Sequence, residues 1–291
     1  MATVGLLHPG EMGAAVGGCL VSVGHTVLWN PAGRSRASTG RALSAGLSGE
    51  GMAAILSRSA VILSICPPHA ALDVARQVAD AGYGGVYVDA NAISVATAAE
   101  VASAVTAGGA SYVDGGIIGP PPEEPGRTRL YLAGSRADEV RALFARSALD
   151  ARIAEGAPFA ASAVKMAYAA WTKGTSALLL AARALARAEG VEQTLLAEWA
   201  LSQPALGRQS ERAAGSAASK GWRWIAEMQE IAASMTAAGL PDGFHQAAAE
   251  VFARAAGSGP ANGPAHAPGA GPGSAGTSGA ETVDTVISAL M

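Results

Sequence analysis

The chain has few aromatic residues, few charged residues and two cysteines. Aromatic side chains make up 5% of its 291 residues and charged side chains 15%, whereas half of the residues are hydrophobic. Alanine and glycine must therefore provide much of the core, where small side chains let helices and strands approach closely. The formal net charge is −3, and a general nucleic-acid binder needs a basic surface to offset phosphate charge. We therefore expect no nucleic-acid partner.

Two further absences bear on location. Cys19 and Cys66 lie in apolar runs without a neighbouring Cys/His cluster, so we expect buried thiols in a reducing compartment and no disulfide or metal site. The N-terminus has no basic segment that leads into a long apolar stretch. Apolar runs such as residues 176–186 are too short to span a bilayer. These features predict a cytoplasmic protein that does not bind a membrane.

Short apolar runs alternate with alanine-rich helical patterns in the first half of the chain. This alternation is typical of a parallel sheet whose strands are joined by crossover helices. We expect strands at residues 3–7, 26–29, 60–66, 86–89, 111–114, 129–133 and 151–154. We expect helices between them at residues 11–23, 36–45, 69–81, 95–107 and 137–145.

Only helical patterns follow after about residue 154. They cover residues 159–189, 194–202, 209–217, 222–238 and 244–256. A Pro/Gly/Ala/Ser stretch with almost no charge comes next, and it cannot bury enough apolar surface to order itself. The predicted organisation is an α/β domain, an all-α domain, a flexible linker and a C-terminal helix, over residues 1–155, 156–256, 257–280 and 281–291. The alternative for the last segment is a frayed tail.

The first strand leads into a glycine-bearing turn that opens the first helix. The turn consists of His8, Pro9, Gly10, Glu11, Met12 and Gly13. In a Rossmann-type domain this turn brings the backbone close to a pyrophosphate, which the unpaired N–H groups and partial positive charge of the helix N-terminus bind. His8 occupies the first glycine position of the usual G-x-G-x-x-G pattern, so the motif alone is weak. Its place directly after the first strand favours a dinucleotide site over an ordinary turn.

The end of the second strand indicates which dinucleotide is bound. NAD-preferring sites place Asp or Glu there to bind the ribose 2′-hydroxyl, whereas this chain has the neutral Asn30, followed by Arg34 and Ser35. Arginine and serine bind a 2′-phosphate that a carboxylate would repel. We therefore predict NADP as the cofactor. The alternative is that Arg34 and Arg36 only begin a solvated helix.

The next two strands also end in turn-forming or polar residues. Loops at the carboxyl ends of parallel strands line the ligand crevice of such domains. We assign the turn Cys66–Pro67–Pro68 to adenosine or ribose contacts and Asn91 to the nicotinamide ribose or amide. Asp89 and Ser94 are equally explained as helix caps.

Together these features resemble the β-hydroxyacid dehydrogenase superfamily, which includes 6-phosphogluconate and 3-hydroxyisobutyrate dehydrogenases and the imine reductases. The resemblance covers residues 1–255. The segments VDGGIIGPPP (113–122), SAVKMAYAAWTKG (162–174) and GLPDGFH (239–245) are similar to an uncharacterised branch of actinobacterial type, often labelled 6-phosphogluconate dehydrogenase-like. The match is specific for fold and cofactor class and poor for substrate.

The resemblance implies that Lys165, on the long helix after the nucleotide domain, is the general acid/base that exchanges a proton with the substrate. Lys165 lies in an otherwise apolar run, where a buried cation is unfavourable without a partner and where desolvation lowers its pKa. The alternative is a lysine whose head reaches water. Relatives carry asparagine one turn later. Tyr168 and Ala169 stand there instead, and Tyr168 either supplies a hydroxyl for catalysis or packs in the core.

The substrate segment also departs from the family pattern. Relatives read D-x-P-V-S-G-G there, whereas this chain has Asp114 and then Gly115, Gly116, Ile117, Ile118 and Gly119. Ile118 replaces a serine that contacts substrate in relatives, so a less polar carbonyl or imine fits best. We expect residues 115–119 to form a loop that shapes a substrate pocket between the domains. His245 is a further candidate substrate contact that could titrate near neutral pH, with a structural histidine as the alternative.

The sequence thus predicts an NADP-dependent oxidoreductase that transfers a hydride between NADPH and a small carbonyl compound or hydroxy acid, with Lys165 handling the proton. An imine reductase and a nucleotide-binding scaffold without turnover are the alternatives. Alanine-rich helices such as residues 177–188 offer a close-packing surface, and dimers are common in this superfamily. We therefore expect a homodimer formed through the helical domain.

Overall fold

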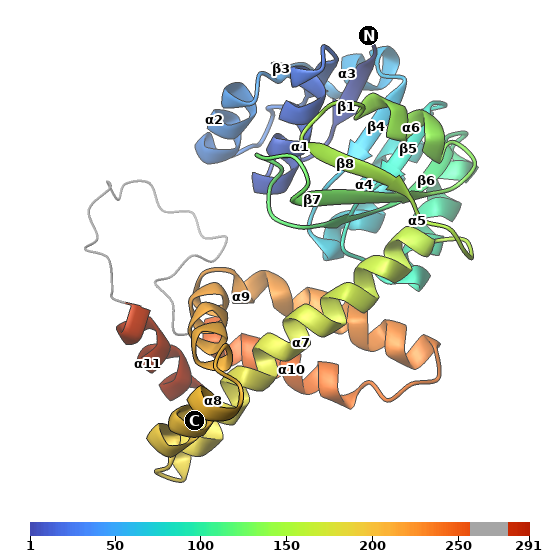
Figure 1. The fold of residues 1–291 in the computed structure, drawn as a ribbon. Helices are drawn as coiled ribbons and strands as arrows, with labels where there is room; N and C mark the ends of the chain where they lie inside the picture. Colours follow the sequence, from blue (N-terminus) through green and yellow to red (C-terminus); the bar gives the residue numbers. More distant parts are fainter. Residues whose placement is uncertain (257–278) are drawn as a thin grey trace. The chain divides into compact units, whose positions relative to one another are not determined.

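The computed structural model describes residues 1–256 and 279–291. It divides into two compact units, Met1–Tyr168 and Ala169–Met291 (Figure 1). All described strands belong to the first unit, and the second unit is helical, which confirms a Rossmann-type α/β domain followed by an all-α region. The division falls inside helix α7 (Ala160–Ala188), later than the boundary expected near residue 155. Residues 257–278 of the predicted linker lie outside the described residues.

The strands form a single eight-stranded sheet in the order β3-β2-β1-β4-β5-β6-β7-β8. Neighbouring strands are parallel except β6 and β7, which pair antiparallel. The strands are β1 (Thr3–Leu6), β2 (Thr26–Trp29), β3 (Ser48–Gly49), β4 (Val61–Ser64), β5 (Val86–Asp89), β6 (Ser111–Ile118), β7 (Thr128–Ala133) and β8 (Leu149–Ile153).

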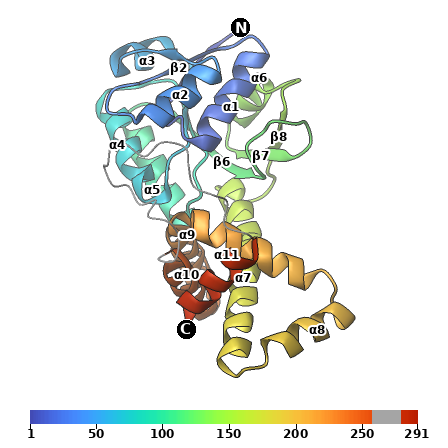
Figure 2. The same ribbon diagram turned by 90° about the vertical axis from the view of Figure 1, so that its left-hand side faces the viewer.

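Helices cover both faces of this sheet (Figures 1 and 2). Successive strand residues point to opposite faces, so strands buried on both sides are apolar throughout, as in the run Val61 to Leu63. One face packs against α1 (Glu11–Ser22), α2 (Arg36–Ser44) and α6 (Ala137–Leu143). The other packs against α3 (Met52–Arg58), α4 (Ala71–Asp80) and α5 (Val95–Ala107), with the short η1 (Pro68–Ala70) leading into α4.

The helical unit contains the second part of α7 and α8 (Glu192–Ser202), α9 (Leu206–Ala237), α10 (Gly243–Ala256) and α11 (Gly279–Leu290). The two helices predicted at residues 209–217 and 222–238 are one continuous helix, α9. Gly221 lies buried within this helix. A Cβ added there would stand 3.3 Å from the Phe252 carbonyl oxygen of α10, so glycine lets the two helices pack closely. Trp224 of α9 packs edge-on against Phe252 at 5.0 Å. None of the described helices combines the length and hydropathy needed to cross a bilayer.

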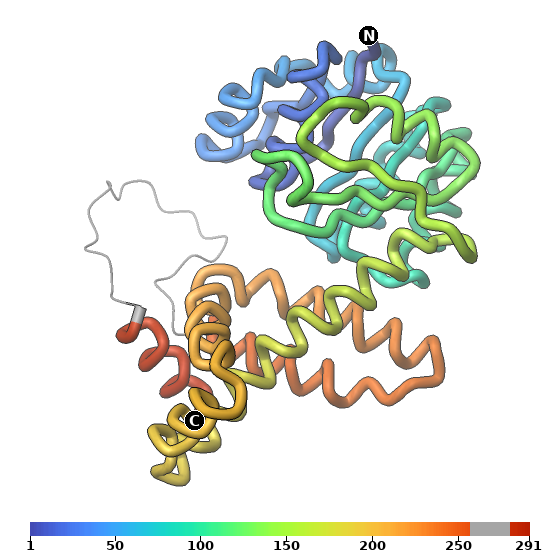
Figure 3. The backbone as a smooth tube through the Cα atoms, in the orientation of Figure 1, coloured from blue at the N-terminus to red at the C-terminus, as the bar shows by residue number. Residues whose placement is uncertain are grey.

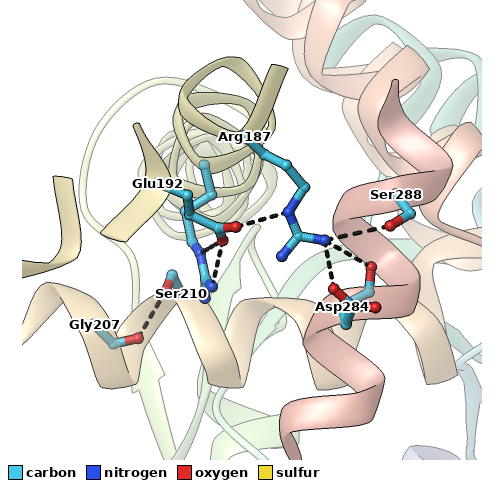
Figure 4. Close-up of polar contacts among 7 residues, drawn as sticks. Arg187, Glu192, Gly207, Ser210, Asp284 and Ser288 are labelled. Carbon is cyan, nitrogen blue, oxygen red and sulfur yellow. Dashed lines mark hydrogen bonds and ion pairs between the residues drawn. The ribbon is translucent and has the colours of Figure 1, made fainter. Parts of the chain in front are cut away.

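The C-terminal helix α11 lies beside α9 (Figure 3), and its side chains Val286 and Ile287 are buried. Polar contacts also join α11 to α7 (Figure 4). The carboxylate of Glu192 accepts hydrogen bonds from the buried Arg183 and from Arg187. Arg187 also donates to Asp284 at 2.7 Å and to Ser288 at 3.3 Å, both on α11. One carboxylate on α8 therefore orients the two arginines of α7, and one of these holds α11.

Candidate functional site

The direction in which strands are added to the sheet reverses between β1 and β4. β2 and β3 lie on one side of β1, and β4, β5 and β6 follow on the other. Ligands of such sheets bind outside the carboxyl ends of the strands that flank this point. The chain leaves β1 through the glycine turn at residues 8–13 and leaves β4 through Cys66, so these two turns flank the ligand crevice expected for this topology.

Two glycines give the first turn a shape that suits a phosphate group. Gly10 is the N-cap of α1, and a Cβ added there would meet nothing within 4 Å. A Cβ at Gly13 would collide with the His8 carbonyl oxygen, so glycine lets the helix start directly against the turn. The N-cap Gly10 makes no side-chain hydrogen bond, and the partial positive charge of this helix N-terminus favours an anion.

Arg34 reaches from the loop after β2 to this turn. Its Nη2 donates a hydrogen bond to the Leu7 carbonyl at 3.0 Å, while its Nε is buried without a partner, as is Nδ1 of His8. Burial, with the nearby Arg34 charge, lowers the pKa of His8 to about 4, so the imidazole is neutral at neutral pH. Burial also lowers the pKa of Arg34. A half-buried guanidinium with an unsatisfied N–H favours an anionic oxygen, so these residues fit a nucleotide phosphate.

The other residues predicted for the cofactor have local structural uses as well. Asn30 accepts a hydrogen bond from the Ala32 N–H at 2.9 Å, and Ser35 caps α2 by accepting from the Ser38 N–H at 3.2 Å. Pro9 is buried and Met12 packs against the core, so they offer mainly backbone to a ligand. Glu11 is exposed in the first turn of α1. The roles of these side chains toward the cofactor stay predictions.

Asn91 joins the ends of β4 and β5. Its Oδ1 accepts from the Cys66 N–H at 2.6 Å, and its Nδ2 donates to the Ser64 hydroxyl at 3.2 Å. The amide thus shapes the turn Cys66–Pro67–Pro68, whereas the predicted nicotinamide contact remains untested. Burial raises the pKa of the Cys66 thiol to about 12, so the thiol stays protonated. Ser94 caps α5 as expected, but Asp89 accepts from the Asn91 N–H and caps no helix.

The predicted substrate loop is a strand over most of its length. Residues 115–118 lie in β6 and pair with residues 129–132 of β7. The side chains of Ile117 and Ile118 are buried, so only Gly119, with φ +127°, belongs to a turn. The expectation of a loop at residues 115–118 was wrong because β7, an antiparallel partner from later in the chain, extends the strand. Their contact with substrate stays a prediction.

Lys165 is bound to this extension of β6. Its Nζ donates to the Ile117 carbonyl at 2.8 Å, and burial lowers the pKa of the amine to about 8. Strand pairing places Leu6, the last residue of β1, level with Val113. Ile117 is four residues further on, or about 13 Å beyond that level at ~3.3 Å per residue. The amine therefore lies past the carboxyl edge of the parallel strands, the edge at which the glycine turn also lies.

Two buried carboxylates on β5 and β6 received no functional role from the sequence. Asp89 and Asp114 are paired in register on β5 and β6. Asp114 accepts hydrogen bonds from the backbone N–H and the hydroxyl of Ser162, at 2.9 and 2.5 Å. Burial, together with the charge of Asp114, raises the pKa of Asp89 to about 7. A buried aspartate needs hydrogen-bond partners. The presence of an aspartate inside an apolar strand was therefore the sequence signal that could have identified these two residues.

Tyr168 and His245 differ in exposure. Tyr168, three residues after Lys165 on α7, is nearly half exposed, which does not fit the alternative of a core aromatic. His245 is buried in α10, where its ring packs edge-on against Phe244 at 5.1 Å. Burial lowers the pKa of His245 below the usual value for histidine. A contact of either residue with substrate remains a prediction.

A small cavity of about 190 Å³ adjoins the N-terminus of α1. Its lining comes from Glu11 and from the turn between β6 and β7, namely Pro120, Pro121, Glu123, Glu124 and Arg127. Three carboxylates face one guanidinium there, so the cavity itself does not favour an anion. By contrast, a Cβ added at Gly10 would meet nothing within 4 Å, so space beside this residue is open.

Comparisons with known proteins bear on the fold of the chain. Residues 186–255 match a family model described as a domain of unknown function, DUF1932. A search of curated proteins found no match. The conserved protein MTH1747, of unknown function and described as structurally similar to 3-hydroxyacid dehydrogenases, is 26% identical. That alignment covers 87% of this chain and 96% of MTH1747, with a TM-score of 0.66.

Two solved enzymes extend the comparison. A 3-hydroxyisobutyrate dehydrogenase of Mycobacterium tuberculosis is 19% identical over 88% of this chain and 94% of its own, with a TM-score of 0.67. A reductive aminase of Aspergillus terreus, in complex with NADPH and ethyl levulinate, is 19% identical over 89% and 95%, with a TM-score of 0.56. The chain shares the fold of the 3-hydroxyacid dehydrogenases and imine reductases. Of these two structures, that of the reductive aminase contains NADPH.

Proposed function

We propose that the protein is an NADP-dependent oxidoreductase that transfers a hydride between NADPH and a small carbonyl compound or hydroxy acid. The observation that supports this most is the Lys165 amine, hydrogen bonded to the Ile117 carbonyl past the carboxyl edge of the sheet. Its pKa of about 8 lets it exchange a proton near neutral pH, which an ordinary lysine does poorly.

The residues around the glycine turn would hold the cofactor. The first N–H groups of α1, opened by Gly10 and Gly13, would bind the pyrophosphate, and Arg34 would bind the 2′-phosphate. NADPH, when bound, supplies the hydride. Neutral His8 fills the place of the first glycine without adding charge.

Lys165 would move the proton that accompanies the hydride. In reduction, the carbonyl carbon gains the hydride and its oxygen gains the proton from the lysine ammonium. In oxidation, the neutral amine removes the hydroxyl proton as the carbon loses its hydride. The Ile117 carbonyl accepts a hydrogen bond from Lys165 in both protonation states, so the amine keeps its place through either direction.

Imine reduction is the second candidate, because the segment Gly115 to Ile118 offers only glycine and isoleucine where hydroxy-acid enzymes of the superfamily carry a serine. A hydroxy acid would lose a polar contact there, whereas an imine needs fewer. The retained Lys165 still favours carbonyl or hydroxy-acid chemistry.

We also propose that the protein is a homodimer formed through the helical unit. Trp171, Leu178 and Leu185 of α7 are 72%, 55% and 65% exposed. Their spacing of seven residues places them on one side of the helix, and α8 buries none of its residues. Such apolar surface is typical of an interface.

Both cysteines are free thiols, which suits the reducing cytoplasm.

The cofactor assignment is tested by titrating the protein with NADPH and NADH while following nucleotide fluorescence. Arg34→Ala should raise the Kd for NADPH about tenfold or more, as expected for losing a charge-assisted hydrogen bond, and should change the Kd for NADH much less. Equal effects on the two cofactors would remove Arg34 from the 2′-phosphate.

Turnover is tested by following NADPH absorbance across a panel of carbonyl compounds and imines. Lys165→Ala should abolish reduction of the best substrate while leaving NADPH affinity unchanged. Full turnover by the Lys165→Ala variant would refute the mechanism. Cofactor binding without turnover of any panel member would favour a nucleotide-binding scaffold.

A further inference from the structure

The first turn of α7 is attached to β6 by a side chain distant in sequence. The carboxylate of Asp114 accepts from the Ser162 N–H at 2.9 Å and from the Ser162 hydroxyl at 2.5 Å, across 48 residues of chain. The first N–H groups of a helix have no partner within the helix, and a negative charge near them is favourable. Asp114 therefore caps α7 from another element.

Burial makes this cap a rigid one. Asp114 is 2% exposed and Ser162 is 1% exposed, so water does not compete for these hydrogen bonds. A buried carboxylate is stable only when its oxygens are hydrogen bonded, so displacing Ser162 would cost Asp114 two of its hydrogen bonds. The helix start cannot move from β6 without breaking these bonds.

Close packing fixes the same turn from two further sides. A Cβ at Gly116 would stand 2.6 Å from the Ala161 carbonyl, so only glycine lets β6 approach α7 this closely. Phe159, directly before α7, has φ +65°, a conformation that bulky residues rarely adopt. Its ring packs against Tyr112 of β6 at 6.0 Å, and this contact supports the strained backbone.

The lysine follows this anchored turn directly. Lys165 is three residues after Ser162 on α7, and Ile117 is three residues after Asp114 on β6. The two contacts Asp114–Ser162 and Ile117–Lys165 thus join the same pair of elements, one after the other. A shift of the helix start would move the lysine away from its carbonyl.

We infer that Asp114 is a positioning residue for Lys165, because it seats the first turn of α7 on β6 so that the amine reaches the Ile117 carbonyl and stays shielded from water. The inference rests on the proposed function in one respect, namely that Lys165 transfers the proton. The surroundings of the amine, however, are measurable without any substrate.

Asp89 provides a matched control. It is paired in register with Asp114, is 1% exposed and is also a carboxylate on a central strand. Its Oδ1 accepts a hydrogen bond from the Asn91 N–H, which follows β5, rather than from α7. Asp89→Asn therefore removes a similar buried carboxylate while leaving the helix cap intact.

The experiment measures the titration of the Lys165 amine. The chain has three lysines, Lys165, Lys173 and Lys220, so trace acetylation over a pH series followed by peptide mass spectrometry resolves each one. The exposed Lys220 corrects for reagent reactivity. Wild-type Lys165 should titrate at a pKa of about 8. Asp114→Asn should raise that midpoint by about one unit or more as the amine gains water, and Asp89→Asn should leave it unchanged.

The sign of the shift separates positioning from charge. Loss of a nearby negative charge lowers a lysine pKa, whereas loss of burial raises it. A fall of the Lys165 midpoint in Asp114→Asn would overturn the positioning role, and so would an equal rise in Asp89→Asn.

Ser162→Ala keeps the proposal testable if Asp114→Asn does not fold. It deletes only the hydroxyl, retains the backbone bond to Asp114, and should raise the Lys165 midpoint by a smaller amount. An unchanged midpoint in folded Ser162→Ala and Asp114→Asn would overturn the inference and leave the proposed function standing. Full turnover by Lys165→Ala would refute the function and leave the positioning result intact.

Discussion

A substitution in the glycine turn can test ligand binding without disturbing the fold. Gly10 has φ −66° and ψ −169°, which alanine also adopts, and a Cβ there would meet nothing within 4 Å. Gly10→Ala should therefore leave the fold intact and even stabilise it by about 0.4–1 kcal/mol, because alanine loses less backbone freedom on folding. A phosphate above Gly10 would collide with the new methyl group.

The expected loss of affinity follows from this collision. Forcing one extra carbon into a close-packed contact costs about 1–3 kcal/mol, which corresponds to a Kd for NADPH raised about 5- to 150-fold. The assay is a fluorescence titration with NADPH, paired with thermal unfolding of the same samples.

Gly51 is the matched control for this substitution. It is also a helix N-cap without a side-chain cap, has φ −70° and ψ 152°, and has nothing within 4 Å of its would-be Cβ. Gly51→Ala should resemble Gly10→Ala in Tm and leave NADPH affinity unchanged. If Gly10→Ala bound NADPH as tightly as the wild type, no phosphate would approach this turn, and the nucleotide site assigned here would be wrong.

Two further outcomes are expected from the site and the helical unit. The rate of reduction should fall as pH rises through about 8, because Lys165 loses its acid form, and the rate of oxidation should rise over the same range. Profiles of kcat that stay flat in both directions between about pH 7 and 9 would contradict this. Leu178→Glu should give monomers in light scattering after size exclusion, whereas Leu43→Glu, at a 65% exposed position on α2, should not change the mass. A dimer that survives Leu178→Glu would place the interface elsewhere.

The sequence predicts most of the sheet and its helices because their signals are local. The run Val86 to Val88 is hydrophobic and bounded by turns, and Ser94 marks the start of α5 with a capping hydroxyl. The missed elements are too short for such signals, since α3 has seven residues and β3 has two. The expected gap between residues 217 and 222 is helical, and Gly221 within it allows the close approach of α10.

In the candidate site, too, local residue patterns predict some features and miss those that depend on residues distant in sequence. Lys165 stands out because a lysine in an apolar helical run demands an explanation, and the resemblance supplied one. Its anchor on Ile117 and the Asp114 cap join residues 48 positions apart, and local pattern carries no information about such pairs. The extension of β6 depends likewise on pairing with β7.

The acceptor that holds the reactive amine belongs to a strand, while the cavity-lining residues 120–127 belong to the turn that follows. A protein engineer can therefore treat the two separately. Randomising that turn would change the lining of the cavity, and the Lys165 amine would keep its hydrogen bond to Ile117 because the sheet, not the turn, supports it.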